Sequence, residues 1–323
     1  MVSQTYGRRA AKSKVDGLTS IPHAETTVNG RNFTHILGVD LGGGKGKKTA
    51  FATLRIEPAG GATVVEIAPR AGGVPLYDGA LVDAIRRVEG APLLCIDAPL
   101  TLPPCLRCSV PVCPGQSACV DPAVIEMRSL AAGNPDDPNV IHVRADRDER
   151  RGKPSVTPYT QRPTEVFWAT RLGIVPREAL GQGTGPLAAR AAHVTRALAD
   201  RFTLNHNLLE VYPKGTLHAL GFARPYKKHL HERETRAAIL EALSSELHFG
   251  PGVWREVCIQ SDHLFEAVIC AFTGYRWARD AWTAPAPDGV DRGEGFSHHR
   301  PDGWIWIPPV AADDVSEPTA AEG

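Results

Sequence analysis

Five carboxylates stand on or at the ends of predicted strands or at the start of a predicted helix, and strand ends are where α/β proteins bind ligands. Asp40 and Asp97 close short apolar runs, Glu210 lies inside a third, and Asp262 precedes Glu266 by one helical turn. Carboxylates buried together repel one another unless a cation joins them. Their oxygens suit Mg²⁺ or Mn²⁺, and a pair of such ions can clamp the reacting oxygens of a phosphodiester. We predict that Asp40, Asp97 and Asp262 bind Mg²⁺ or Mn²⁺, and that Glu210 and Glu266 are auxiliary catalytic residues.

Each carboxylate also has a purely structural interpretation. Asp40 can accept hydrogen bonds from the glycine turn that follows it, and Asp262 can cap its helix. Glu210 can pair with an arginine of the preceding helix, such as Arg190 or Arg196. Asp97 can be a turn residue, and Glu266 can be a solvated helix residue. The joint placement of all five favours a shared metal site over these separate roles.

Four of the seven cysteines crowd into one short, proline-rich segment with the spacing C-x2-C-x4-C-x5-C. The first pair has the spacing of a metal-binding turn. Tetrahedral coordination by four thiolates favours Zn²⁺, with an iron–sulfur cluster as the second choice. Free or redox-active thiols are the alternative, because nothing in the chain indicates an exported disulfide framework. The predicted zinc ligands are Cys105, Cys108, Cys113 and Cys119.

A turn rich in glycine and lysine follows Asp40 at 42–48. Backbone N–H groups and ammonium groups attract anions, so Lys45 and Lys47 are predicted phosphate contacts. The turn lacks the GxxxxGK[ST] spacing of a P-loop. It resembles the first phosphate loop of actin-like kinases, which makes ATP-dependent phosphoryl transfer an alternative activity. Such kinases normally contain a duplicated domain, whereas this chain shows one copy.

Apolar patterns predict the elements that position these residues. Three strands come first, followed by a helix and a fourth strand, and the later strands alternate with helices. The first three strands can pair antiparallel, whereas the later ones need helical crossovers and are therefore parallel. This α/β order, a mixed sheet flanked by helices, matches the ribonuclease H-like topology. The predicted strands span 35–41, 49–56, 62–67, 92–97, 208–212 and 304–307, and the main helices span 77–88, 186–202, 232–247 and 262–282.

Composition sets the predicted domain boundaries. Residues 1–33 are polar and aperiodic, so we expect a flexible arm, and we expect 309–323 to form a disordered tail. One ribonuclease H-like domain fills 34–308. It contains a Cys-rich insertion at about 100–185 that is too long for a plain loop and should carry its own structure.

Several segments together resemble the domain of unknown function 429 family, and the resemblance covers nearly everything between the two tails. It implies a ribonuclease H-like fold and a nuclease activity. It also implies that the acidic positions of the family fall on Asp40, Asp97, Glu210 and Asp262. Many relatives have a second aspartate in the last helix, where this chain has Glu266. The segments are GVDLGGGKGKKTAFA at 38–52, CIDAPLTLPPCLRC at 95–108, PLAAR at 186–190, EVYPKGTLHALG at 210–221, SDHLFEAVICAFTGY at 261–275 and GWIWIP at 303–308.

The charge balance limits the kinds of partner. Lys plus Arg and Asp plus Glu each number 36, so the formal net charge is zero. Proteins that bind duplex DNA usually carry a basic excess, so a nucleic-acid contact would need local patches such as 144–153 or 224–233. No apolar run is long enough to cross a bilayer, so we expect a cytoplasmic location and no membrane contact. The chain fits a metal-dependent nuclease acting on nucleic acid or nucleotide, with a nucleotide- or nucleic-acid-binding protein without turnover as the second hypothesis.

Overall fold

Seven described strands of the protein form one mixed sheet, as a computed structural model shows for residues 32–43, 48–132, 156–222, 224–227, 232–284 and 303–309. Within these residues the strand order is β8-β3-β2-β1-β6-β7-β9, and a separate two-stranded ladder joins β4 to β5. The strands are β1 (His35–Asp40), β2 (Ala50–Ile56), β3 (Ala62–Ala68), β4 (Arg70–Ala71), β5 (Val74–Pro75), β6 (Pro92–Asp97), β7 (Leu208–Val211), β8 (Leu247–Phe249) and β9 (Ile305–Trp306).

The direction of the strands follows the predicted pattern. β1, β2 and β3 pair antiparallel in chain order. β6 then pairs parallel with the other side of β1, and β7 and β9 continue in the same direction. This confirms the prediction of an α/β mixed sheet with three antiparallel strands followed by parallel ones. Of the predicted arm at 1–33 and the predicted tail at 309–323, residues 1–31 and 310–323 lie outside the described part of the chain.

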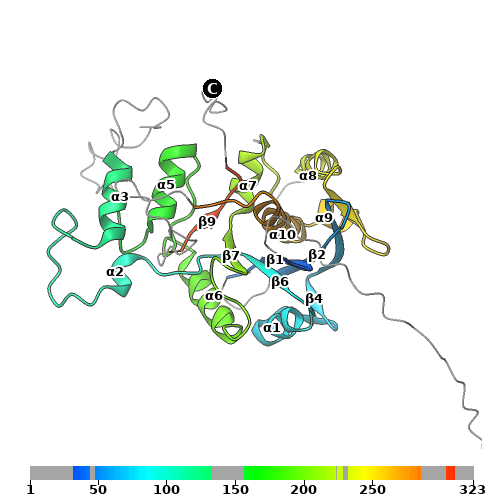
Figure 1. Cartoon of the computed structure of the whole chain (residues 1–323), viewed down its shortest axis with the longest axis horizontal. Helices are drawn as coiled ribbons and strands as arrows, with labels where there is room; N and C mark the ends of the chain where they lie inside the picture. Colours follow the sequence, from blue (N-terminus) through cyan, green and yellow to red (C-terminus); the bar gives the residue numbers. More distant parts are fainter. Residues whose placement is uncertain are drawn as a thin grey trace, which may run out of the picture.

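Helices cover both faces of the sheet (Figure 1). α10, α7 and α8 pack on one face, and α1 and α6 pack on the other. α2, α3 and α5 come from the predicted insertion and lie beside the sheet. No helix of the described part combines the length and apolar character needed to cross a membrane. The helices are α1 (Asp78–Arg86), α2 (Pro104–Arg107), α3 (Pro122–Ala132), α5 (Pro163–Leu172), α6 (Gly185–Ala197), α7 (Pro213–Ala219), α8 (Glu232–Ala242), α9 (Arg255–Gln260) and α10 (Asp262–Arg279).

The predicted helix at 232–247 is shorter in the structure, and a strand follows it. α8 ends at Ala242, and Leu247 begins β8, which pairs parallel with β3. Leu243 and Leu247 are both buried, as expected from their helical spacing. The pairing with β3 nevertheless makes Leu247 the first residue of a strand. Long-range pairing of this kind overrides local propensity.

Side chains alternate between the two faces along the central strands. On β1, Ile36 joins the core beneath α10, whereas Leu37 and Val39 join the core beneath α1 and α6. Position 40 shares the face of Ile36 because strand side chains repeat every second residue. The alternation therefore turns Asp40 toward α10.

α10 lies very close to β1 and β6 because a glycine stands at each contact. Gly38 on β1 faces α10, and Gly274 on α10 faces β6. A Cβ atom at Gly38 would lie 2.0 Å from the carbonyl oxygen of Ala267 in α10. A Cβ atom at Gly274 would lie 2.3 Å from the sulfur of Cys95 on β6. The absence of side chains at these two positions allows the helix to approach the sheet, which brings its first turn to the end of β1.

Gly38→Ala is expected to destabilise the fold. The new methyl group meets backbone atoms of α10, which cannot rotate away, and such overpacking typically costs about 1–3 kcal/mol. Urea denaturation measures the free energy of unfolding. Gly79→Ala is the matched control, because nothing lies within 4 Å of a Cβ atom there. An equal loss of stability in the two variants would contradict the close-packing argument.

Candidate metal centre

The sheet places two of the predicted carboxylates side by side. Asp40 on β1 and Asp97 on β6 are partners in the parallel register. Neighbouring strands are about 4.8 Å apart, and paired residues on parallel strands point to the same face. Cys95 belongs to the core beneath α10, so Asp97, two residues later, faces α10 as Asp40 does. Both strands end here, so the two acids lie at the carboxyl edge of the sheet.

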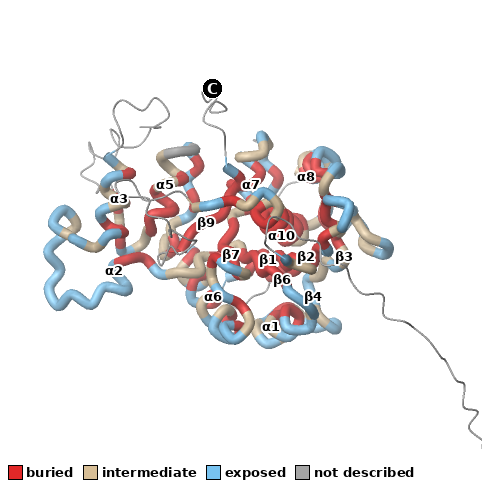
Figure 2. Tube along the Cα trace, in the orientation of Figure 1, coloured by how far each residue is buried: buried red, intermediate tan, exposed pale blue. Residues whose placement is uncertain are grey.

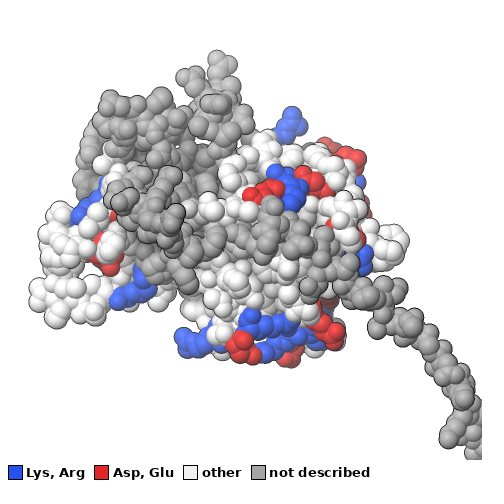
Figure 3. Space-filling model, viewed as in Figure 1, with Lys and Arg blue, Asp and Glu red and all other residues white. Residues whose placement is uncertain are grey.

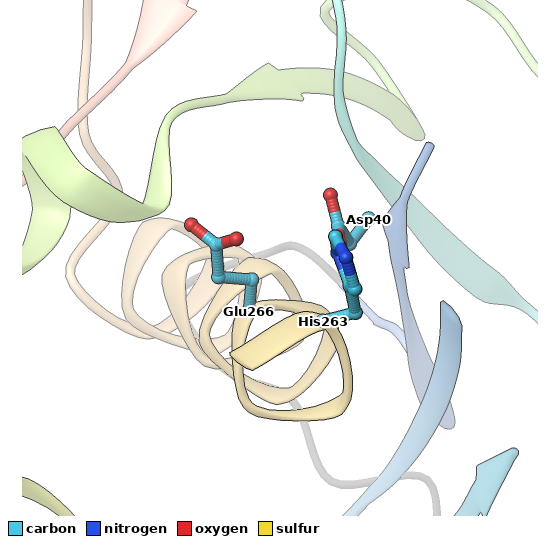
Figure 4. A group of neighbouring side chains, drawn as sticks. All are labelled: Asp40, His263 and Glu266. Carbon is cyan, nitrogen blue, oxygen red and sulfur yellow. The ribbon is translucent and has the colours of Figure 1, made fainter. Parts of the chain in front are cut away.

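The first turn of α10 adds a histidine and a glutamate. Ser261 caps this helix by accepting a hydrogen bond from the N–H of Leu264 at 3.4 Å. His263 and Glu266 are three residues apart and therefore lie on one face of the helix. Figure 4 shows both side chains rising from the helix beside Asp40.

Asp40, His263 and Glu266 form a cluster with the spacing of a metal site. One ligand atom from each lies within 4.8 Å of the other two. The Nδ1 atom of His263 is 2.6 Å from Oδ2 of Asp40, a hydrogen-bond distance. Asp40 and Glu266 are buried, whereas the His263 side chain is 35% exposed and gives the cluster contact with solvent. This cluster can hold a metal ion.

Glu266 also binds two groups from the segment before α8. The hydroxyl of Tyr226 donates a hydrogen bond to Oε1 of Glu266 at 2.8 Å. The Nζ atom of Lys227 lies 2.6 Å from the same oxygen. Lys227 is 44% exposed, so its ammonium group sits at the border between the buried carboxylates and water. A positive charge therefore already balances part of the cluster.

Crowding of negative charge changes the protonation of the site. Burial raises the pKa of Asp97 well above its usual range, and the carboxylates of Glu266 and Asp40 raise it further. Burial also raises the pKa of Glu266, against the opposing effect of Lys227. The hydrogen bond to Asp40 raises the pKa of His263. Each shift shows that the site favours added positive charge, which is the property of a cation site.

The donor set narrows the choice of metal. Two carboxylates suit Mg²⁺, Ca²⁺ and Mn²⁺, whereas an imidazole nitrogen favours Mn²⁺, Fe²⁺ or Zn²⁺ over Mg²⁺. Asp40, Glu266 and His263 supply two oxygens and one nitrogen, so Mn²⁺ fits the set better than Mg²⁺. The sequence predicted both ions on the basis of oxygen ligands alone.

Asp262, a predicted ligand, lies next to the cluster and is not one of its three members. It is the first residue of α10, and its Oδ1 accepts a hydrogen bond from the N–H of His263 at 3.1 Å. The same oxygen is 4.0 Å from Nε2 of His263. The structure thus places Asp262 in contact with His263 of the cluster, and a role of Asp262 as metal ligand stays a prediction.

Glu210 is not brought into the cluster. It pairs in register with Ile96, whose side chain lies in the core on the opposite face of the sheet from Asp97. Its two oxygens bind Nη1 and Nη2 of Arg162 at 2.7 and 2.6 Å. The N–H of Leu100 donates a third hydrogen bond to it at 2.9 Å. An arginine does pair with Glu210, although it comes from the insertion and not from α6.

Arg162 joins Glu210 to a second buried acid. Its guanidinium also contacts Glu165 at 2.5 Å, and none of the three side chains is more than 4% exposed. Nη1 of Arg162 donates a further bond to the hydroxyl of Thr101 at 2.9 Å. Two carboxylates thus share one buried cation, and the pKa of Arg162 is raised because both carboxylates outweigh the effect of burial. This network connects Arg162 and Glu165 of the insertion to Glu210 on β7 and to the segment that follows Asp97.

The remaining predicted site residues do not converge in the described residues. Lys45 and Lys47 lie outside the described part of the chain. The four clustered cysteines are described and form no disulfide, but no three of their sulfur atoms lie within 4.8 Å of one another. Zinc binding by Cys105, Cys108, Cys113 and Cys119 stays a prediction.

Sequence reasoning assigned no partner to three residues that the structure places at these sites. His263 stands three residues before Glu266 in SDHLFE, and this spacing was a readable signal of a shared helix face. Lys227 and Arg162 lie in segments without periodicity. Their contacts with Glu266 and Glu210 depend on the tertiary fold, and no local pattern indicates them.

Comparison with known proteins decides the family. A family model described as protein of unknown function (DUF429) matches residues 38–290, which is well over half of the chain. The chain belongs to the DUF429 family. The match confirms the family predicted from the motifs, and the DUF429 region contains Asp40, Asp97, His263 and Glu266. Comparisons of this DUF429 protein with curated proteins and with solved structures found no match.

Proposed function

We propose that this protein is a divalent-metal-dependent phosphodiester hydrolase of ribonuclease H-like type. The observation that carries the proposal is the convergence of Asp40, His263 and Glu266 at the end of β1. Asp97 lies beside Asp40 in register and is a candidate for a further ligand. A metal ion at such a site polarises a phosphoryl oxygen and lowers the pKa of a bound water. Carboxylates at the ends of neighbouring strands, such as Asp40 and Asp97, are suited to hold such an ion.

The protein's own residues would divide the remaining work. Asp40 and Glu266 would hold the ion, and Asp97 would add charge on the sheet side. His263 can act as a ligand or exchange a proton through its ring, since its side chain reaches solvent. Lys227 is the described cation closest to Glu266 and would contact a substrate phosphate once a metal ion takes over that carboxylate.

The formal net charge of zero favours a substrate with few phosphate groups. On the face shown in Figure 3, basic and acidic groups are interspersed, notably over α1 and α6, and the described atoms form no continuous basic surface there. A long duplex needs many phosphate contacts, because these supply most of its non-specific affinity. A nucleotide, a cyclic dinucleotide or a short single strand needs few. These are therefore the first substrates to test.

Incubation with Mn²⁺ and a panel of DNA, RNA, branched and cyclic dinucleotide substrates tests the proposal. Cleavage of at least one substrate that requires Mn²⁺ and is lost in Asp40→Asn is expected. Absence of cleavage across the panel, together with calorimetric binding of a nucleotide, would favour a binding protein without turnover. Transfer of the γ-phosphate of ATP to an acceptor would favour the phosphotransferase. Arg55→Ala, a change at an exposed ion pair on β2, is the control for general damage.

Lys227→Gln is expected to tighten binding of Mn²⁺ by about tenfold, which corresponds to about 1.4 kcal/mol. The ammonium group and the metal ion compete for the same oxygen of Glu266, so removal of the lysine charge favours the metal. Isothermal calorimetry measures the Kd. Tyr226→Phe is the matched control, because it removes a neutral hydrogen bond to the same oxygen. Weaker binding in Lys227→Gln would show that the lysine supports the ion and does not compete with it.

A further inference from the structure

The segment between α2 and α3 has no apolar core of its own. Every residue from 105 to 120 is exposed except Gln116 and Cys119, which are partly buried. Figure 2 shows this loop in pale blue along most of its length. Its larger apolar side chains face water, since Val112 and Val120 are 81% and 82% exposed. Apolar burial therefore cannot offset the conformational entropy that a fixed loop of this length loses.

Hydrogen bonds to other described residues anchor the segment near its two ends. At the first end the N–H of Cys105 donates to the carbonyl of Pro158 at 3.0 Å. At the second end Arg128 of α3 donates to the carbonyls of Gln116 and Ser117. The part between these anchors holds two of the four cysteines. Another interaction is needed to fix it.

The thiols have the surroundings of metal ligands. All four are free of disulfides. The N–H of Val110 points at the sulfur of Cys108 at 3.5 Å, and donors of this kind orient and stabilise a thiolate that binds a metal. The spacing C-x2-C-x4-C-x5-C places a short turn between the first two cysteines, which is the arrangement by which two thiolates bind one ion.

We propose that Cys105, Cys108, Cys113 and Cys119 bind one zinc ion that closes this segment. Four thiolates complete a tetrahedral shell with Zn–S distances of about 2.3 Å, and each thiol releases its proton to solvent on binding. No three of the described sulfurs lie within 4.8 Å of one another, so a shared ion would require the exposed loop to draw together. A shell closed by four protein ligands leaves no position for substrate, which makes this site structural.

The zinc site would stabilise the route from the sheet into the insertion. The chain runs from Asp97 at the end of β6 through Thr101, which Arg162 contacts, into α2 and the cysteines. A closed loop would hold α2 and α3 at a fixed separation beside this route. The proposal does not depend on the proposed hydrolase, because the two metal sites share no residue.

Metal analysis of the purified full-length protein tests the zinc site. We expect about one zinc per chain in the parent protein and in Asp40→Asn, and little or none in the double variant Cys108→Ser/Cys113→Ser. The double variant should keep its affinity for Mn²⁺, whereas Asp40→Asn should lose it. Failure of the hydrolase and failure of the zinc site are therefore separate results.

A second readout uses the parent chain and needs no variant to fold. Replacement of zinc by Co²⁺ should produce the visible absorption of tetrahedral thiolate coordination. Chelation should increase tryptic cleavage after Arg107, because the loop is no longer closed. Parent protein without zinc, full retention of zinc by the double variant, or iron and sulfide in place of zinc would each overturn the proposal.

Discussion

The Asp97→Asn variant is expected to be more stable than the parent protein when metal is absent, and about 10- to 100-fold less active when metal is present. Asp97 is half-buried beside Asp40 and Glu266, and desolvation together with their negative charge raises its pKa. Asparagine has nearly the same shape and no charge. It therefore relieves the repulsion but also removes a negative group that would face the ion.

The direction of the pH effect follows from this raised pKa. In the unfolded chain Asp97 ionises at its usual pKa of about 4, but in the folded chain it holds its proton to higher pH. The parent protein therefore loses stability as pH rises through the interval between the two values, and each unit of difference costs about 1.4 kcal/mol. The stability gain of Asp97→Asn should be present at neutral pH in chelator and should shrink as pH falls toward 4.

Thermal unfolding in chelator and in Mn²⁺ measures the stability of the parent and of the variant without and with the metal. The expected pattern is a crossover, in which the variant melts above the parent in chelator and gains less from added Mn²⁺. Ser261→Ala is a useful control, because it removes the cap of α10 without changing a carboxylate. An Asp97→Asn protein that is less stable than the parent in chelator would show that Asp97 is not repelled by its neighbours.

Arg162→Ala is expected to lower the free energy of unfolding by about 3–5 kcal/mol, the typical result of breaking a buried ion pair. Arg162 is fully buried and is shared by Glu165 and Glu210. Its removal leaves two carboxylates in the interior without a cation. Urea denaturation measures the loss.

Two comparisons make the Arg162 result specific. The exposed pair of Arg55 and Glu57 should contribute about 0–1 kcal/mol, so Arg55→Ala should be nearly silent. The triple variant that joins Arg162→Met to Glu165→Gln and Glu210→Gln should recover much of the stability, because it removes the whole charge network. Equal stability of Arg162→Ala and the parent would contradict a buried charge network.

Much of the fold follows from local patterns in the chain. The apolar runs ending at Asp40 and Asp97 are β1 and β6, and the helical spacing from Asp262 onward is α10. These patterns suffice to place Asp40, Asp97 and Glu266 near the same edge of the sheet. The family match and the order of the strands agree with the fold predicted from these patterns.

Two parts of the site needed information that no local pattern contains. Glu210 lies on the opposite face because its register partner is Ile96, and register depends on how β7 docks against β6. A shift of one residue in that register would have turned it toward Asp97. His263 joins Asp40 because Gly38 lets α10 approach β1, a contact between positions far apart in the chain. Tertiary packing therefore decides which of the predicted acids join the cluster, and it adds a histidine to them.

A crystal structure of the protein soaked in Mn²⁺ would give the most direct test of the shared site. Anomalous scattering should place one manganese ion between Oδ2 of Asp40, an imidazole nitrogen of His263 and a carboxylate oxygen of Glu266. Lys227 should then have moved away from Glu266. A manganese peak elsewhere, or none at saturating Mn²⁺ with Lys227 still bound to Glu266, would show that these side chains do not form a metal site.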